Sequence, residues 1–172
     1  MTKTEQHQRF EQWMGDHIAI LYRVANGFAE ETDRDDLMQE VMLAVWKAVP
    51  HFRGHSKPTT FLYRVSHNAA LTWRRTRQNY QKHIEEAGVF AAIENQLDNA
   101  APRDQLLEQL YAAIRCLPGV DRSLILLSLD GVNYDEMAAI HGLSESNVGV
   151  KLNRIKQRLT KQLTEKENCE LQ

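Results

Sequence analysis

Apolar residues recur at spacings of three and four along the first part of the chain, which is the spacing that places side chains on one face of an α-helix. One such run covers residues 10–28, and a second covers residues 37–48, after which Pro50 ends it. Asp33 or Asp35 can cap the start of the second helix. Neither run alternates as a strand would, so the pattern predicts two amphipathic helices.

A third helix is predicted after the polar loop at residues 51–58, with Thr59 or Thr60 as its cap and its end at about Gln78. The periodic pattern weakens over residues 81–104, which are acidic and hold few large apolar residues. We expect a flexible linker there. Its apolar residues could form one short helix, and they are Val89, Phe90, Ile93 and Leu97.

Helical spacing resumes in the second half of the chain, in two runs at residues 106–117 and 121–129 that a Pro-Gly pair separates. Two more helices follow them. The pattern as a whole predicts an all-α protein with two helical domains joined by the flexible linker. The N-terminal bundle covers residues 1–80 and the C-terminal domain covers residues 105–165, with a polar tail at residues 166–172.

The last two predicted helices form a helix-turn-helix. Asn133, with Glu136 three residues later, predicts an Asx-type capping box for a short helix over residues 134–141, and Gly142 suits its C-terminal end. Ser144 caps the long helix that follows. The apolar residues of the long helix that face inward are Val148, Leu152, Ile155 and Leu159. In a helix-turn-helix that binds DNA, the second helix lies in the major groove.

The outward face of this last helix carries side chains that suit a DNA groove. Its members are Ser146, Asn147, Val150, Lys151, Arg154 and Arg158. Arginine and lysine bind guanine edges and phosphates, asparagine binds adenine, and an apolar group contacts the thymine methyl. The alternative is that the face is only the solvated side of a core helix.

The third helix offers a second candidate surface for nucleic acid. One stripe holds Tyr63, His67, Ala70, Arg74 and Arg77, and the next holds Arg64, Asn68, Leu71 and Arg75. Aromatic, amide and arginine groups side by side suit unstacked bases, and the loop at residues 52–57 has the size and polarity to hold an extruded base. A solvated basic helix end is the alternative.

Acidic and amide side chains gather on the second helix. Asp35 and Asp36 are explained by the preference of acidic residues for a helix N-terminus. Gln39 and Glu40 lie past the first turn, so they could bind a basic protein partner.

The composition is that of an ordinary globular chain of 172 residues, with 42% hydrophobic and 26% charged residues, and it excludes collagen-like, disulfide-rich and wholly disordered proteins. Cys116 and Cys169 are too few for a disulfide framework and form no CxxC pair, so we expect reduced thiols. No apolar run approaches the ~18–20 residues of a membrane helix, and the polar N-terminus does not resemble a secretory signal. We therefore expect a cytoplasmic protein without membrane insertion.

The charge balance argues against an autonomous DNA binder. The net charge is −2, from 21 basic and 23 acidic residues, whereas a free-standing nucleic-acid-binding domain usually has an isoelectric point above about 9. Affinity for free DNA scales with the number of phosphates neutralised. A subunit delivered to DNA by a large partner does not need a strongly basic surface.

The sequence contains none of the common motifs of enzymes. It has no phosphate-binding GxxxxGK[ST], no GxGxxG, no GxSxG and no HExxH. His51 and His55 form the one close histidine pair, and no further metal ligand is near them in sequence, so we expect ordinary loop residues. We expect no catalytic residues, no metal and no cofactor. The three tryptophans, Trp13, Trp46 and Trp73, are expected at the core or its edge.

Two groups of segments together resemble the extracytoplasmic-function sigma factors, which direct bacterial core RNA polymerase to promoters. The first group, at residues 36–46, 52–54, 61–68 and 74–75, is similar to region 2 of that family. The second group, at residues 117–118, 130–131, 134–138, 142–144 and 147–148, is similar to region 4 with its helix-turn-helix. Both groups occur in the family's order, with the linker between them.

The resemblance implies three sets of contacts. The clamp helices of the largest polymerase subunit would be contacted by Asp36, Gln39 and Glu40. The melted −10 element would be bound by Phe52, Arg53, His55, Lys57, Arg64, Asn68 and Arg74. The −35 element would be read as duplex by Ser146, Asn147, Val150, Lys151, Arg154 and Lys156.

The resemblance also implies the partners, which are core RNA polymerase, including its upstream-binding flap, promoter DNA and a cognate anti-sigma factor. A chain of this kind is not itself an enzyme. Two other functions stay open on the residues alone. One is a stand-alone helix-turn-helix regulator, and the other is a helical adaptor whose basic helix faces are only solvated.

Overall fold

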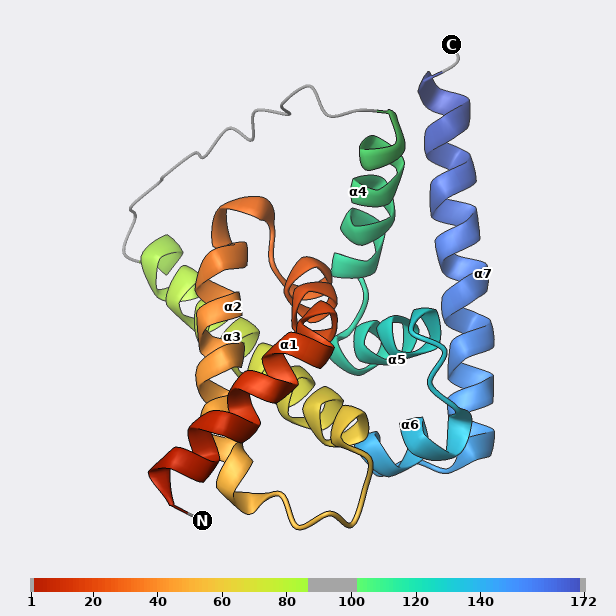
Figure 1. Ribbon diagram of the computed structural model, residues 1–172. Coiled ribbons are helices and arrows are strands. Elements are labelled where there is room, and N and C mark those ends of the chain that lie inside the picture. The colour runs from red at the N-terminus through yellow and green to blue at the C-terminus, as the bar shows by residue number, and fades with distance from the viewer. Residues whose placement is uncertain (1, 87–101, 171–172) are drawn as a thin grey trace.

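The computed structural model describes the backbone of residues 2–86 and 102–170 and the side chains of residues 2–79 and 105–164. Its elements in chain order are α1 (Lys3–Phe28), α2 (Glu31–Ala48), a 3-10 turn η1 (Val49–His51), α3 (Pro58–Glu86), α4 (Pro102–Arg115), α5 (Gly119–Leu129), α6 (Tyr134–His141) and α7 (Glu145–Glu170) (Figure 1). The described residues form helices and no strands, which confirms the all-α prediction. The short helix suggested at residues 89–97 lies outside the described residues.

The first three helices pack on one another around an apolar centre. Leu21 of α1, Leu37 and Val41 of α2, and Leu62 of α3 are fully buried there. Trp13 is 5% exposed and packs edge-on against Phe52, which fixes the loop before α3 to this core. The other two tryptophans are half-buried, as predicted: Trp73 packs against the core, and Trp46 lies edge-on against Phe10, with ring centroids 5.3 Å apart.

The last four helices form a second apolar centre around α5. Leu124 and Leu127 of α5 are fully buried, and Ile114 of α4, Met137 of α6 and Leu152 of α7 close around them. The core positions predicted for the last helix are all buried, and they are Val148, Leu152, Ile155 and Leu159. This packing holds α6 and the start of α7 in a helix-turn-helix.

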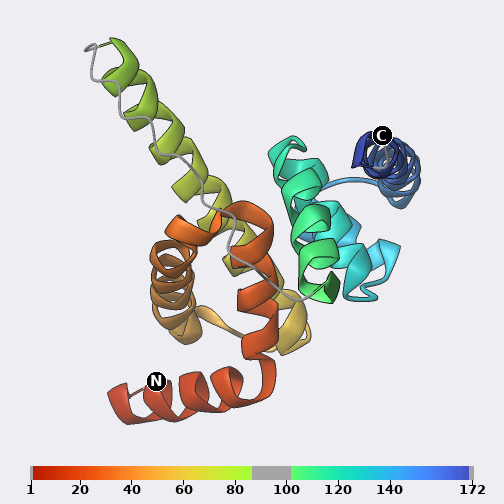
Figure 2. The same cartoon turned by 90° about the horizontal axis from the view of Figure 1, so that it is seen from above.

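The two halves of the chain are packed against each other. Helix α1 contacts α4 and α5, and α3 contacts α5 and α6 (Figures 1 and 2). Two glycines allow this close approach, because a Cβ atom at Gly27 would lie 2.5 Å from Leu126 and one at Gly119 would lie 2.5 Å from Leu71. The exposed end of α3 projects beyond this body (Figure 2).

Helix starts differ from the predictions in two places. Helix α2 begins at Glu31, so neither Asp33 nor Asp35 caps it, and the carboxylate of Asp33 instead pairs with Arg77 of α3. Helix α3 begins at Pro58, because proline has no amide hydrogen to lose in the first turn of a helix and already holds a helical φ. The predicted caps Thr59 and Thr60 are therefore wrong.

The ends of two helices also differ. Helix α3 continues to Glu86, beyond the predicted end at Gln78, and α7 continues to Glu170, beyond the start of the predicted polar tail. Both extensions have polar sequences. A helix can continue through polar residues where it projects beyond its packed segment. The domain limits at residues 80 and 105 remain predictions.

The turn of the helix-turn-helix forms as predicted, with one exception. Gly142 ends α6 in the left-handed conformation at a φ of 65°, and the hydroxyl of Ser144 accepts the amide hydrogen of Asn147. Asn133 occupies the N-cap of α6, but its side chain makes no capping bond. The predicted capping box does not form, because the carboxylate of Glu136 binds Lys57, in the loop before α3, instead.

Candidate nucleic-acid and partner interfaces

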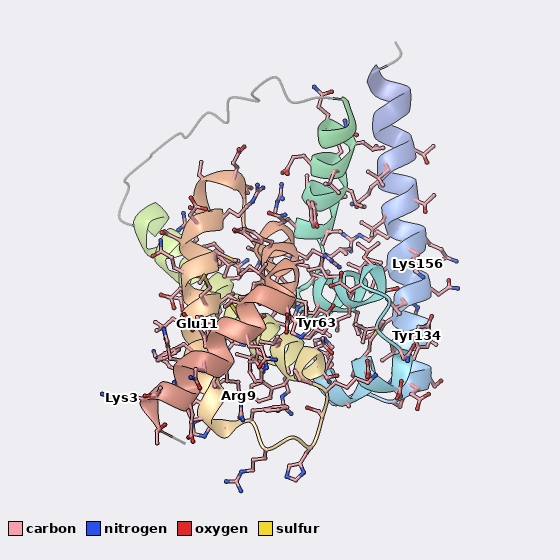
Figure 3. The ribbon with its side chains drawn as sticks, viewed as in Figure 1. Lys3, Arg9, Glu11, Tyr63, Tyr134 and Lys156 are labelled. Carbon is pink, nitrogen blue, oxygen red and sulfur yellow. The ribbon has the colours of Figure 1, made fainter. Side chains whose placement is uncertain are left out.

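The candidate duplex-reading residues lie on the open side of α7. Ser146, Asn147, Arg154 and Lys156 are exposed, and Val150 is 48% exposed. Lys156 points away from the rest of the molecule (Figure 3). The exposure of Ser146, Asn147, Val150 and Arg154 confirms the prediction that these four face away from the core.

Lys151 differs from the other members of this face. It is half-buried, and its ammonium group donates a hydrogen bond to the carboxylate of Asp121 on α5 at 3.0 Å. The bond to Asp121 holds the Lys151 side chain against its own domain. Lys151 can reach a DNA phosphate only if this ion pair breaks.

The loop before α3 divides into an anchored end and a free end. Phe52 is half-buried, with its ring centroid 5.1 Å from both Trp13 and Phe61. Arg53 and His55 are exposed on either side of Gly54, which has a left-handed backbone conformation with a φ of 76°. Phe52 therefore positions the loop, while the next residues are available to a ligand.

Two of the predicted −10 residues contact the second half of the chain. The Lys57 ammonium group lies 2.8 Å from Glu136 of α6, and this hydrogen bond and charge raise the pKa of Lys57. Arg74 is half-buried and donates to the carbonyl of Leu117 at 3.4 Å. Neither side chain is free in this conformation.

A shallow groove between α2 and α3 holds two of the predicted site residues together. Asn68 of α3 and Glu40 of α2 both line it, with Leu43, Lys47 and Trp73 among the other side chains. Arg64 is exposed nearby on α3, with its guanidinium 5.6 Å from the centre of the Phe61 ring. The groove therefore joins an expected polymerase-binding residue to an expected DNA-binding residue.

The acidic and amide residues of α2 present an open face. Asp36, Gln39 and Glu40 are all exposed, on the side of α2 that faces away from its buried residues. None of the three forms an ion pair or a side-chain hydrogen bond among the described residues. The face is therefore free to receive basic side chains from a partner.

One predicted surface is wrong. Of the first α3 stripe, Tyr63 and His67 are 7% and 1% exposed, because the second half of the chain covers them. The Tyr63 hydroxyl donates to Asp130 at 2.8 Å, and His67 Nδ1 lies 2.6 Å from the hydroxyl of Ser123. Tyr63 lies where α3 meets the C-terminal helices (Figure 3). These two side chains do not form a nucleic-acid surface in this conformation.

The residues that join the two halves were missed by the sequence analysis. Arg23 of α1 pairs with Asp130 at the end of α5, and Arg115 of α4 donates to the carbonyl of Asn26 at 3.0 Å. Each is an ordinary polar residue of an amphipathic helix in the sequence. No periodicity could have shown that they pair across domains.

No metal site or membrane helix is found among the described residues. They contain no group of three or more His, Cys, Asp or Glu side chains placed to hold a metal ion. His51 and His55 are both exposed; His55 lies in the loop before α3, as predicted, whereas His51 ends the 3-10 turn η1. No described helix is both long and apolar enough to cross a membrane.

Two family models match the chain in separate segments. The model of sigma-70 region 2 matches residues 9–80, and the model of sigma-70 region 4 matches residues 107–159. The first segment contains most of α1, all of α2 and most of α3, and the second contains the helix-turn-helix. These segments correspond to the two apolar centres of the structure.

Curated relatives give the same result at the level of sequence. The chain is 30% identical over 132 residues to the RNA polymerase sigma factor YlaC of Bacillus subtilis, which covers 75% of this chain and 76% of that protein. It is 31% identical over 119 residues to the ECF RNA polymerase sigma-E factor of Escherichia coli K12. That second match covers 63% of this chain and 62% of the relative.

Two solved structures share the fold. One is the sigma factor RpoE in complex with the anti-sigma factor NepR from Bartonella quintana, with a TM-score of 0.68, 21% identity, and coverage of 91% of this chain and 98% of that chain. The other is CnrH in complex with the cytosolic domain of CnrY, with a TM-score of 0.65, 22% identity, and coverage of 92% and 89%.

Proposed function

The chain belongs to the sigma-70 family of RNA polymerase sigma factors, in its extracytoplasmic-function group, and we propose which of its surfaces binds the polymerase and which bind each promoter element. The α2 face docks on core polymerase, the loop before α3 and the adjoining groove take the melted −10 element, and α7 reads the −35 duplex. The family consists of transcription initiation factors rather than enzymes. The observation that carries the proposal is the match of both regions, in order, on one chain.

The α2 face suits the clamp helices of the largest polymerase subunit. Asp36, Gln39 and Glu40 offer two carboxylates and one amide without internal partners, and such a face is complementary to a basic helical surface. A stand-alone helix-turn-helix regulator would leave this face, and the region 2 match around it, without a role. We propose the polymerase flap as the partner of the C-terminal domain.

The loop and groove suit single-stranded DNA. Arg53 and His55 are exposed in the loop, and Arg64 and Asn68 are exposed about one turn apart on α3; they offer cationic, aromatic and amide groups to an unstacked base and its backbone. Phe52 anchors the loop in the core, which lowers the conformational entropy lost when a base binds. Lys57 and Arg74 join this surface when their contacts with the C-terminal half are released.

The sigma factor RpoE is bound to the anti-sigma factor NepR, and CnrH is bound to the cytosolic domain of CnrY; we propose that this chain also has an anti-sigma partner in the cytoplasm. Such a partner would cover the α2 face or the surfaces between the two halves. In this proposal the side chains of α7 select the −35 sequence of the promoter. Direct determination of the promoter sequence is the first test.

Co-elution with bacterial core RNA polymerase, followed by transcription from a random promoter library, tests the whole proposal. We expect stable association and chain-dependent starts that share an upstream and a −10 element. Duplex binding by the chain alone, without association with the polymerase, would support an autonomous regulator instead. Absence of both activities would contradict a sigma factor.

Replacing Arg154 with alanine tests base reading by α7. We expect promoter binding of the holoenzyme to weaken by ~1–3 kcal/mol, with relaxed preference at one or two upstream positions, because arginine binds guanine edges through two hydrogen bonds. The measurement is binding to a library of −35 variants at fixed salt. Thr160→Ala, at an exposed position six residues further along α7, is the control. An equal loss on every sequence would show phosphate binding instead.

Replacing Glu40 with lysine tests docking of α2. We expect weaker holoenzyme assembly with an unchanged helical spectrum, because the substituted lysine would face basic groups of the partner. Affinity for core polymerase is measured by fluorescence anisotropy. Glu11→Lys makes the same charge change at an exposed site on α1 and should keep normal affinity. Normal affinity of the Glu40→Lys variant would remove Glu40 from the interface.

A further inference from the structure

Two histidines meet where the halves of the chain are packed together. His67 of α3 and His141 of α6 have ring centroids 6.2 Å apart. His67 is 1% exposed, and its Nδ1 atom is bonded to Ser123 of α5 at 2.6 Å. The Nε2 atoms of both histidines are buried and have no hydrogen-bond partner among the described residues.

The groups around this pair give no compensation for a positive charge. On the α1 side the neighbour of His67 is the ring of Phe28, at 5.8 Å. Charged groups on the surrounding elements are already paired. Arg23 of α1 pairs with Asp130 after α5, which also accepts a hydrogen bond from Tyr63 of α3, and Lys57 in the loop before α3 pairs with Glu136 of α6. Arg122 of α5 is also positively charged, and its guanidinium lies over the Phe28 ring, 4.9 Å from the ring centroid.

We propose that His67 and His141 form a proton-sensitive latch, which keeps the two halves closed while both imidazoles are neutral and opens them when the imidazoles are protonated. Two imidazolium ions at this distance would repel each other in a site of low dielectric. Opening removes Ser123 and His141 from His67 and returns both rings to water. The latch is a side-chain device of this chain and needs no other protein.

The sign of the pH dependence follows from burial. Burial, and secondly the charge of His141, lower the pKa of His67 from 6.5 to about 3, and burial also lowers the pKa of His141. In the open form both values return to about 6.5. The open form therefore binds more protons, so closure is strongest above pH 6.5 and weakens as the pH falls below it.

The functional consequence rests on the proposed function. The −10 and −35 elements are about 25 base pairs apart, or ~85 Å along B-DNA at ~3.4 Å per base pair. In the closed form, Lys57 of the −10 surface touches Glu136 of the helix-turn-helix at 2.8 Å. One closed molecule cannot bind both elements at once. Acidification would therefore increase the fraction of the chain that can use a promoter.

The test is the ratio of open to closed molecules as a function of pH. The full chain carries dyes at two exposed positions, introduced as Gln8→Cys on α1 and Asn153→Cys on α7, with Cys116→Ser and Cys169→Ser, and the ratio is read by single-molecule energy transfer. Between pH 7.5 and 5.5 we expect the ratio to rise by up to about 100-fold, which is roughly tenfold for each histidine.

Variants assign the effect to the two rings. His67→Asn keeps a polar atom near Ser123 without titrating, and His141→Gln removes the second proton site. Each single variant should show a rise of about tenfold, and the double variant should show none. His55→Gln, in the exposed loop, should behave as the parent does. If the double variant does not fold, the half-buried His141→Gln variant alone still decides the question.

Three results would overturn the latch. They are a change of less than about threefold in the parent, the same rise in His141→Gln as in the parent, and a loss of helical circular dichroism that accompanies opening. The last would show acid unfolding instead of domain opening. The energy-transfer experiment contains no polymerase or DNA, so a result that overturns the latch would leave the proposed function intact. Conversely, failure of the chain to bind polymerase would leave the latch intact.

Discussion

Replacing Arg122 with methionine is expected to lower the free energy of unfolding by about 3–5 kcal/mol. Arg122 is 1% exposed and has no carboxylate partner among the described residues. It donates instead to the carbonyls of Phe28 at 3.4 Å and Leu117 at 3.2 Å, and to that of Arg115. Methionine fills much of the same space but leaves these buried acceptors without a donor.

The position of these carbonyls explains why a lone buried cation is tolerated. Phe28 ends α1 and Arg115 ends α4, and the C-terminal end of a helix carries a partial negative charge. Burial, followed by the charges of Arg74 and Arg115, lowers the pKa of Arg122 to about 9, so the guanidinium stays charged at neutral pH. One side chain thus stabilises the ends of helices from both halves.

Urea unfolding followed by circular dichroism measures this effect. Arg158→Met is the matched control, because Arg158 is exposed on α7 and the same substitution there should change the stability by less than about 0.5 kcal/mol. A loss below about 1 kcal/mol in the Arg122→Met variant would show that water replaces the guanidinium without a penalty.

Replacing Arg23 with glutamate is expected to open the two halves at neutral pH. The Asp130 side chain is 2% exposed, and Arg23 of α1 is the cation that pairs with it. The substitution brings a carboxylate against a buried carboxylate. Because Arg23 itself is 43% exposed, we expect closure to weaken by about 2–3 kcal/mol, or roughly 30- to 150-fold, which is less than for a fully buried pair.

The same energy-transfer measurement at pH 7.5 detects this opening. Arg9→Glu, at an exposed position earlier on α1, is the control and should stay closed. Urea unfolding of each half should be little changed, since Arg23 contributes to the contact between halves and not to either core. A closed Arg23→Glu variant would mean that the apolar contacts of Gly27 and Gly119 are sufficient by themselves.

The candidate surfaces were predictable where their residues lie on one helix. Asp36, Gln39 and Glu40 are within about one turn of α2, and Asn147 to Arg154 follow one face of α7, so helical spacing alone placed them together. The groove that joins Glu40 to Asn68 could not be predicted, because it depends on how α2 packs on α3. The burial of Tyr63 and His67 could not be predicted either.

Helix ends show the same division. Gly142 and Ser144 act through their own backbone and their nearest neighbours, and both were predicted correctly. The capping roles of Asp33 and of Asn133 with Glu136 were predicted wrongly, because Asp33 binds Arg77 of α3 and Glu136 binds Lys57 in the loop before α3. A partner that is distant in sequence can outweigh a local hydrogen bond of about 1 kcal/mol.

The sequence by itself determined the helical class, the two apolar centres and the outward faces of α2 and α7, because these follow from the 3.6-residue period and from local capping. Only the tertiary structure decided that the two halves pack against each other and that polar residues of α1, α3, α5 and α6 form hydrogen bonds and ion pairs in that contact. The physical reason is that a polar side chain has the same local pattern whether water or another domain satisfies it. Its partner is fixed only when the chain folds.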